Sequence, residues 1–227
     1  MSENLKNSET PASLLLEAKN ISHNFDYELF KDINLKVNSK ESIAIIGTSG
    51  SGKSTFLNIL SSLLKPTTGN VVFKSKDIYS LKQNEILNIR REDFGIIFQA
   101  HYLFRGFSAE ENLEVAKYLS NKEIDYNFLK ELDIAHVLNQ GVGELSGGQQ
   151  QRLSIARILL KKPKIIFADE PTGNLDKDTA LLVMNALFKY IKEQDAALVL
   201  VTHEESLAFM CDRVLKLEEF NLKEIKE

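Results

Sequence analysis

The sequence predicts an α/β fold with a mostly parallel sheet, an antiparallel β lead-in and an inserted helical subdomain. Short apolar segments alternate with segments of helical spacing along most of the chain, which is the pattern of parallel sheets. Two strand patterns come before this alternation, and purely helical spacing fills the middle of the chain. With 227 residues the chain can bury a full α/β core. We therefore expect a single domain over residues 1–227, with the helical subdomain at approximately 100–160.

The antiparallel lead-in consists of two predicted strands, Leu14–Asn20 and Ile33–Val37, joined by a polar connection. The connection contains Phe25 and Tyr27. An aromatic ring here can stack on a purine base or pack under the sheet. Packing is the commoner fate of a phenylalanine, so the residues alone favour it.

A phosphate-binding loop follows the next strand. An apolar segment, Ser42–Ile46, precedes eight residues that fit the pattern G-x-x-x-x-G-K-[ST], and helical spacing follows from Thr55 to Leu60. A simple glycine- and serine-rich turn would lack this strand and helix. We therefore predict a nucleoside triphosphate site in which backbone N–H groups hold the phosphates, Lys53 reaches the β- and γ-phosphates, and Ser54 ligates Mg²⁺. Its residues are Gly47, Thr48, Ser49, Gly50, Ser51, Gly52, Lys53 and Ser54, with Thr55 beginning the helix.

The middle of the chain changes from strands to helices. The predicted elements are a turn at Pro66–Gly69, a strand at Asn70–Phe73, a surface helix at Asn84–Arg91, a strand at Phe94–Phe98 and helical segments over Ala109–Gln140. The last of these strands ends at Gln99, just before an aromatic cluster formed by His101, Tyr102, Phe104 and Phe107. Such a cluster is either packed within its loop or a surface for a partner.

A second anion-binding end is predicted at Ser146-Gly147-Gly148-Gln149, where a helix begins that runs to about Leu160. Ser146 occupies the N-cap position, and the helix N-terminus behind it attracts negative charge. The chain thus offers two phosphate-binding ends that are far apart in sequence.

Carboxylates follow the next buried strand, Lys164–Ala168. Oxygen ligands suit magnesium, so we expect Asp169 to hold Mg²⁺ and Glu170, on the opposite side, to polarise an attacking water. A solvated acidic strand end is the alternative, but the apolar strand and the phosphate loop argue against it.

The last predicted helix and strands follow a turn. The helix covers about Lys177 to Glu193, with Asp176 or Asp178 as its cap. A buried strand at 197–202 ends at His203, which would reach the γ-phosphate from the same sheet edge as Asp169. Residues 213–217 would close the sheet, and the charged segment 218–227 shows little potential to join the core.

Composition excludes several classes of protein. Lys and Arg total 28 and Asp and Glu total 32, a net charge of −4, so we expect no nucleic acid partner. The single cysteine, Cys211, rules out an intrachain disulfide framework. No apolar run approaches the roughly 20 residues of a membrane span, and Met1–Thr10 is polar with no apolar signal segment.

Taken together, the chain from about Leu15 to Leu222 resembles the ATP-binding subunits of ATP-binding cassette (ABC) transporters. The diagnostic segment is Leu145–Gln149, which other phosphate-loop NTPases lack. The other family motifs fall in order on Phe25, Gly47–Ser54, Gln99, Ile165–Glu170, Asn174–Asp176 and His203. The resemblance implies that Phe25 stacks on adenine. It also implies a catalytic site of Glu170, His203, Gln99 and Lys53, with Ser54, Gln99 and Asp169 around the metal.

The resemblance also implies how the protein works. Its cofactors would be ATP and Mg²⁺. The ATP-bound state would be a head-to-tail homodimer in which Ser146, Gly147, Gly148 and Gln149 face the partner's nucleotide. Integral membrane permease subunits would hold it at the cytoplasmic face of a bacterial inner membrane. Within the family, the segment Ala168–Asp176 looks like the branch for lipoprotein release and macrolide or peptide export; the alternative is the cell-division type, which regulates cell-wall hydrolases. Two departures from the family pattern concern its partner surface: a somewhat short helical insertion, and the absence of a glycine around Glu219-Phe220.

Overall fold

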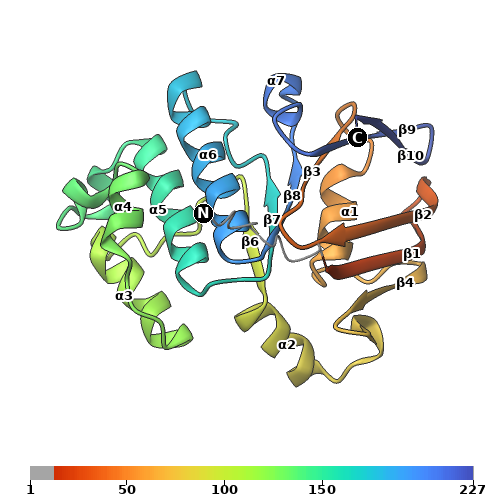
Figure 1. Ribbon diagram of the computed structural model, residues 1–227, viewed down its shortest axis with the longest axis horizontal. Coiled ribbons are helices and arrows are strands. Elements are labelled where there is room, and N and C mark those ends of the chain that lie inside the picture. Colours follow the sequence, from red (N-terminus) through yellow and green to blue (C-terminus); the bar gives the residue numbers. More distant parts are fainter. Residues whose placement is uncertain (1–12, 227) are drawn as a thin grey trace, which may run out of the picture.

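A computed structural model describes residues 13–226, so the predicted polar segment Met1–Thr10 lies outside the described residues (Figure 1). Two sheets form the core. The larger has six strands in the order β10-β9-β3-β8-β7-β6, and the smaller has four in the order β2-β1-β4-β5. Only β10 runs antiparallel to its neighbour in the larger sheet. The predicted mostly parallel sheet is confirmed.

The antiparallel sheet begins with a hairpin of β1 (Leu14–Asn24) and β2 (Glu28–Asn38), followed by β4 (Thr68–Phe73) and β5 (Lys76–Asp77). Both hairpin strands are longer than predicted, and a tight turn replaces the expected connection. Phe25 and Tyr27 lie in that turn and are 57% and 64% exposed. The expectation that Phe25 packs under the sheet is wrong, because Phe30 occupies the core beneath the hairpin.

The parallel strands of the larger sheet are β3 (Ser42–Ile46), β6 (Phe94–Ile97), β7 (Ile165–Asp169), β8 (Ala197–Val201) and β9 (Arg213–Glu218). β3 and β8 are buried at every residue, because both faces of the sheet are covered. The carboxyl ends of β3, β7 and β8 meet at one edge. The phosphate loop, Asp169-Glu170 and His203 follow these three ends, so the sheet brings together segments that are distant in sequence.

Helices cover the two faces unequally. On one face α1 (Lys53–Leu60) packs with the β lead-in, and on the other lie α5 (Gly147–Leu160) and α6 (Lys177–Glu193). Two further helices are α2 (Gln83–Glu92) and α7 (Glu205–Ala208), the latter not predicted. Of the two candidate caps for α6 it is Asp176 that acts, since its Oδ1 accepts from the Thr179 N–H at 3.0 Å.

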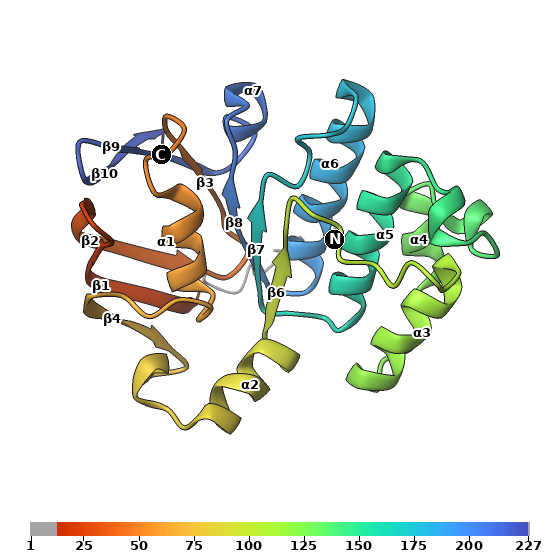
Figure 2. The same cartoon turned by 180° about the vertical axis from the view of Figure 1, so that it is seen from behind.

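The helical part lies beyond β6, on the opposite side of the molecule from the hairpin (Figures 1 and 2). It contains α3 (Ala109–Ser120), α4 (Tyr126–Glu131) and α5, with short 3₁₀ turns at Ala135–Val137 and Val142–Glu144. Leu113, Leu129 and Leu153 belong to the same buried cluster as Ile166 and Leu198 of the sheet. The helical part and the sheet therefore share one core.

The carboxyl-terminal segment corrects a prediction. Residues Asn221–Lys226 form β10, which pairs antiparallel with β9 and makes the outer edge of the sheet, and Leu222 packs against the core. The tight turn between the strands places Glu219 and Phe220 at φ 48° and 63°, a left-handed conformation that favours glycine. The Lys31 N–H donates to the Phe220 carbonyl at 2.9 Å and anchors this turn. Over residues 13–226, no helix is both long enough and apolar enough to cross a membrane.

Candidate nucleotide-binding site

The phosphate loop connects β3 to α1, and its backbone requires glycine at the helix start. Gly52 caps α1 at φ 95°, and a Cβ there would lie 3.2 Å from the Phe30 ring. The Lys53 ammonium donates to the carbonyls of Gly47 and Thr48, both at 2.9 Å, so it lies over the loop. The Ser51 hydroxyl is buried in this loop without a hydrogen-bond partner. A phosphate oxygen is an acceptor that would satisfy such a group. The helix begins at Lys53, two residues earlier than expected.

Ser54 and Asp169 come together from α1 and β7. The Ser54 hydroxyl donates to Oδ1 of Asp169 at 3.0 Å. Burial raises the pKa of Asp169, opposed by the Ser54 hydrogen bond and aided by the charge of neighbouring Glu170. A hydroxyl and a carboxylate are the hard oxygen donors that Mg²⁺ takes beside phosphate oxygens. The predicted pair therefore fits a nucleotide-bound magnesium ion.

Glu170 lies between β7 and β8 with its carboxylate held by two partners. The Thr202 hydroxyl donates to Oε2 at 3.2 Å, and His203 Nδ1 lies 2.9 Å from Oε1. Glu170 adopts φ 48°, a strained conformation of the kind found at functional sites. The hydrogen bond to Glu170 and its negative charge raise the pKa of His203. Glu170 therefore faces His203, while Asp169 faces Ser54.

Thr202 is a site residue that the sequence reasoning missed. The sequence pattern identifies Thr202 only as the last residue of a buried strand. In the structure it is fully buried, its hydroxyl donates to Glu170, and the same hydroxyl accepts the Glu204 N–H at 3.1 Å. The available signal was a hydroxyl residue in a run of aliphatic ones, directly before His203.

The hairpin turn, the phosphate loop and Glu170 line one open cleft of about 770 Å³. Phe25, Tyr27 and Leu29 form its aromatic and apolar side. The Phe25 ring stands edge-on to His23, with ring centroids 4.8 Å apart, and so is supported from one side while exposed on the other. The predicted site residues in this cleft are Phe25, Ser49, Gly50, Gly52, Lys53, Ser54, Thr55 and Glu170.

The structure keeps the second anion-binding end apart from this cleft. Ser146–Gln149 begins α5 in the helical part, with the sheet and α6 between it and α1 (Figures 1 and 2). Ser146 Oγ accepts the Gln149 N–H at 3.2 Å, and Gln149 Oε1 accepts the Ser146 N–H at 2.8 Å, so the predicted N-cap is confirmed. Gln99 is exposed after β6 and is not hydrogen-bonded to Ser54 or Asp169. Its metal and catalytic roles stay predictions.

Comparisons with known proteins agree with this geometry. The family model described as "ABC transporter" matches residues 30–173. The lipoprotein-releasing system ATP-binding protein LolD of Rickettsia bellii is 42% identical, covering 90% of this chain and 95% of its own length. LolD of Wigglesworthia glossinidia brevipalpis is 38% identical, covering 90% and 94%.

Comparison with solved structures indicates the same family. The ATP-binding cassette MJ0796, determined as a dimer in a post-hydrolysis state bound to ADP and Pi, superimposes with a TM-score of 0.83 at 32% identity, covering 94% of this chain and 100% of that one. Fold, phosphate loop, acidic strand end and these relatives all lead to one assignment. The chain belongs to the ABC transporter family, as one of its ATP-binding, ATP-hydrolysing domains.

Proposed function

We propose that this protein is the ATP-hydrolysing motor subunit of a lipoprotein-releasing transporter, acting as a homodimer when ATP is bound. The observation that carries the proposal is the pair of anion-binding ends, which one chain cannot bring to the same phosphate. The relatives named for lipoprotein release are 38% and 42% identical over 90% of the chain, which supports the choice of system.

In the proposed site the phosphate loop, residues 47–54, holds the ATP phosphates and Phe25 stacks on the adenine. Ser54 and Asp169 hold Mg²⁺, which neutralises phosphate charge, and Gln99 joins them when the site is loaded. The exposed Phe25 ring at the mouth of the same cleft supports the stacking role. Lys53 moves from the loop carbonyls to the β- and γ-phosphates.

Glu170 is the proposed general base for the attacking water. Its contacts with Thr202 and His203 hold the carboxylate in one orientation, which lowers the cost of positioning it for proton transfer. His203 is 68% exposed on its side chain, so it can contact the γ-phosphate while bound to Glu170.

A second copy completes the site by presenting its α5 start to the first copy's γ-phosphate. The N–H groups of Gly147 and Gly148 lie in the first turn of α5, and the Ser146 hydroxyl caps it. These donors stabilise negative charge that develops on the transferred phosphoryl group. The dimeric form of MJ0796 supports this arrangement.

The membrane partners are integral permease subunits, which place the protein at the cytoplasmic face of a bacterial inner membrane. The family description "ABC transporter" and the relatives named for a lipoprotein-releasing system support this. The net charge of −4 gives no reason to expect nucleic acid as a partner. Hydrolysis becomes mechanical work only through these subunits.

Glu170→Gln tests the proposal, because it keeps the side-chain shape and removes the base. ATP hydrolysis should fall by about 10²-fold or more while ATP binding survives, and an ATP-bound dimer should accumulate. Turnover and light scattering with ATP measure both effects. Glu205→Gln is the control, an exposed acid on the same side of the sheet, and should behave like the parent. A monomer in ATP, or near-normal hydrolysis by Glu170→Gln, would contradict the proposal.

A further inference from the structure

A basic cleft lies at the sheet edge opposite the nucleotide site. It is an open space of about 1120 Å³ bordered by the carboxyl-terminal ends of α2, α3, α5 and α6. Lys164 directly precedes β7, whereas Asp169 ends it. At about 3.3 Å per residue, the strand separates the cleft from the magnesium pair by at least about 13 Å. The two sites are therefore distinct, and they share no lining residue.

Positive charge gathers in this cleft although the whole chain is acidic. Its charged side chains are Arg91, Lys122, Lys161, Lys162, Lys164 and a single carboxylate, Glu92. The Glu92 carboxylate already forms an ion pair with Arg91, with 2.8 Å between Arg91 Nη2 and Glu92 Oε1. Four helix C-termini also end here and contribute about half a negative charge each. The five cations contribute five positive charges, and Glu92 together with the four helix ends contributes about three negative ones. The net charge of the cleft is therefore roughly two positive charges, which complements a phosphate dianion.

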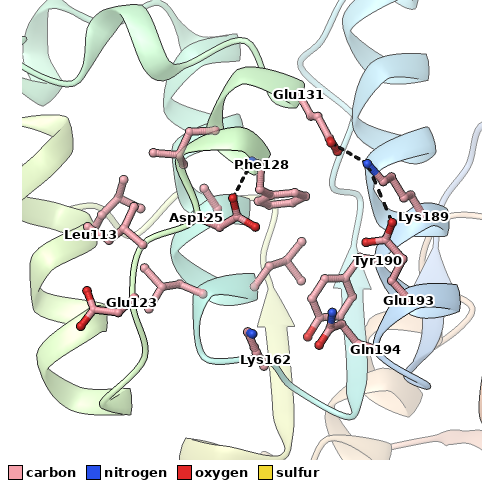
Figure 3. A pocket seen from close by; sticks show the side chains of 15 residues that line it. Leu113, Glu123, Asp125, Phe128, Glu131, Lys162, Lys189, Tyr190, Glu193 and Gln194 are labelled. Atoms are coloured by element: carbon pink, nitrogen blue, oxygen red, sulfur yellow. Dashed lines mark hydrogen bonds and ion pairs between the residues drawn. The ribbon is translucent and has the colours of Figure 1, made fainter.

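In the neighbouring pocket, unlike the basic cleft, a lysine side chain is paired with carboxylates. It lies between α3, α4, α5 and α6, shares Lys162 and Gln194 with the basic cleft, and has an apolar floor (Figure 3). There Lys189 is paired with two carboxylates, 2.5 Å from Glu131 and 3.9 Å from Glu193. Among the ion pairs of residues 13–226, none involves Lys122, Lys161, Lys162 or Lys164.

Lys161 is the most enclosed of these cations. Its ammonium donates to the Arg90 carbonyl at 2.6 Å, and burial lowers its pKa to about 8, opposed by the charge of Asp93. Asp93 in turn is held by Lys74 at 2.9 Å. Lys161 is half-buried and has no carboxylate of the described residues within ion-pair distance, so a bound anion would replace part of the solvation that its ammonium has lost.

We propose that this cleft binds a phosphate-bearing anion, separately from the ATP site. A phosphate group presents several acceptor oxygens and up to two charges, which match the ammonium donors of Lys122, Lys161 and Lys162. The group can belong to free phosphate or to the headgroup of an anionic lipid. The test distinguishes these two sources.

The first arm titrates the full chain with inorganic phosphate while a magnesium-bound non-hydrolysable ATP analogue fills the phosphate loop. Backbone amide NMR shifts at residues 119–122 and at Lys161, Lys162 and Lys164 should change and saturate. Removing both cations in a Lys122→Gln, Lys162→Gly variant should weaken binding by about tenfold. Lys162 has φ 56°, so glycine there relieves backbone strain and folding is not at risk. Lys189→Gln is the matched control and should bind as the parent does.

The second arm measures cosedimentation with phosphatidylglycerol vesicles and with phosphatidylcholine vesicles. Saturable phosphate shifts without vesicle binding support a free phosphate ligand. Binding to the anionic vesicles alone, lost in the double variant and kept in Lys189→Gln, supports a lipid headgroup. Two results together overturn the proposal. The phosphate-induced shifts never saturate or spread over the whole surface, and vesicle binding is either absent or unaffected by the double variant.

Discussion

At the residue scale, Asp169 and Glu170 face different partners. The alternation of side chains along a strand predicts this split. In the structure Asp169 ends β7 and faces Ser54, whereas Glu170 follows the strand at φ 48° and faces Thr202 and His203. The sequence was sufficient to predict that split. It could not show that the Thr202 hydroxyl would fix Glu170, because that contact spans 32 residues and depends on β7 pairing with β8.

Asp212 is a second residue whose partner is distant. Its Oδ2 accepts from the backbone N–H and hydroxyl of Ser42, at 2.8 and 2.6 Å, joining the start of β3 to the segment before β9. Burial acts to raise the pKa of Asp212, but the hydrogen bonds from Ser42, together with the charge and hydrogen bond of Lys192, outweigh it and lower the pKa overall. The ionised form is therefore the one that stabilises the fold.

We expect Asp212→Asn to lower the free energy of unfolding by about 1 kcal/mol at pH 7, an amount reduced because the side chain is 49% exposed. Because the folded pKa is depressed, this contribution is present above the unfolded value near 3.9 and is lost as pH falls through the folded value. Urea unfolding of both proteins between pH 7 and pH 3 measures it. Glu131→Gln, which breaks a surface ion pair, is the control; an equal loss at both pH extremes would contradict the charge argument.

At the element scale, the loop after β6 presents aromatic rings on a fixed backbone. Asn112 is fully buried and bonds both the N–H and the carbonyl of Phe104, at 2.9 and 3.2 Å. Arg157 of α5 donates to the Tyr102 carbonyl at 2.7 Å and lies over the Phe104 ring. Yet Tyr102 is 68% exposed and Phe104 49%. These hydrogen bonds hold the loop backbone, while the two rings remain available to a partner.

Tyr102→Ala combined with Phe104→Ala should therefore weaken binding to the permease by about thirtyfold or more, since buried aromatic anchors are worth about 2 kcal/mol or more. Basal ATP hydrolysis and the melting temperature should change little. Copurification with the permease beside a melting curve measures both. Tyr118→Ala removes an even more exposed ring from α3 and is the control. Loss of stability together with activity would mean that the rings serve this chain's own packing.

At the scale of the whole molecule, the two anion-binding ends belong to helices that pack in different hydrophobic clusters. The phosphate loop connects β3 to α1, and Ser146 caps α5, which packs on the opposite face of the sheet from α1 (Figure 1). A site that needs both ends must use two chains. In such a dimer each site combines the phosphate loop of one chain with the start of α5 of the other.

Mixing two inactive variants tests this. Gly148→Asp should block closure, because its carboxylate would repel the partner's phosphate, while Lys53→Ala disables the phosphate loop. The fold should tolerate Gly148→Asp, since a Cβ there meets Leu175 at 3.4 Å, an ordinary contact distance. Each variant alone should lose hydrolysis. Heterodimers of the two should recover one working site, measured as turnover against mixing ratio. If well-mixed heterodimers remain inactive, the ends do not act on opposite chains.

The sequence by itself determined the phosphate loop, the parallel strands, the start of α5 and the limits of α6. These depend on local rules: fixed residues in a motif, apolar runs, and N-cap residues such as Ser146. The residues within each element are enough to apply these local rules, and the order of the motifs along the chain was sufficient to indicate the family.

Only the tertiary structure decided where these pieces meet and which local preferences fail. Phe25 stays exposed because Phe30 fills the space beneath the hairpin, and the charged end of the chain becomes β10 because β9 offers it a free edge. Glu219 and Phe220 take left-handed backbone angles without glycine because pairing of β9 with β10 outweighs the strain. The basic cleft likewise arises from helix ends that are up to about 100 residues apart in sequence. Long-range packing sets all of these, since its energy exceeds the local preference of any single residue.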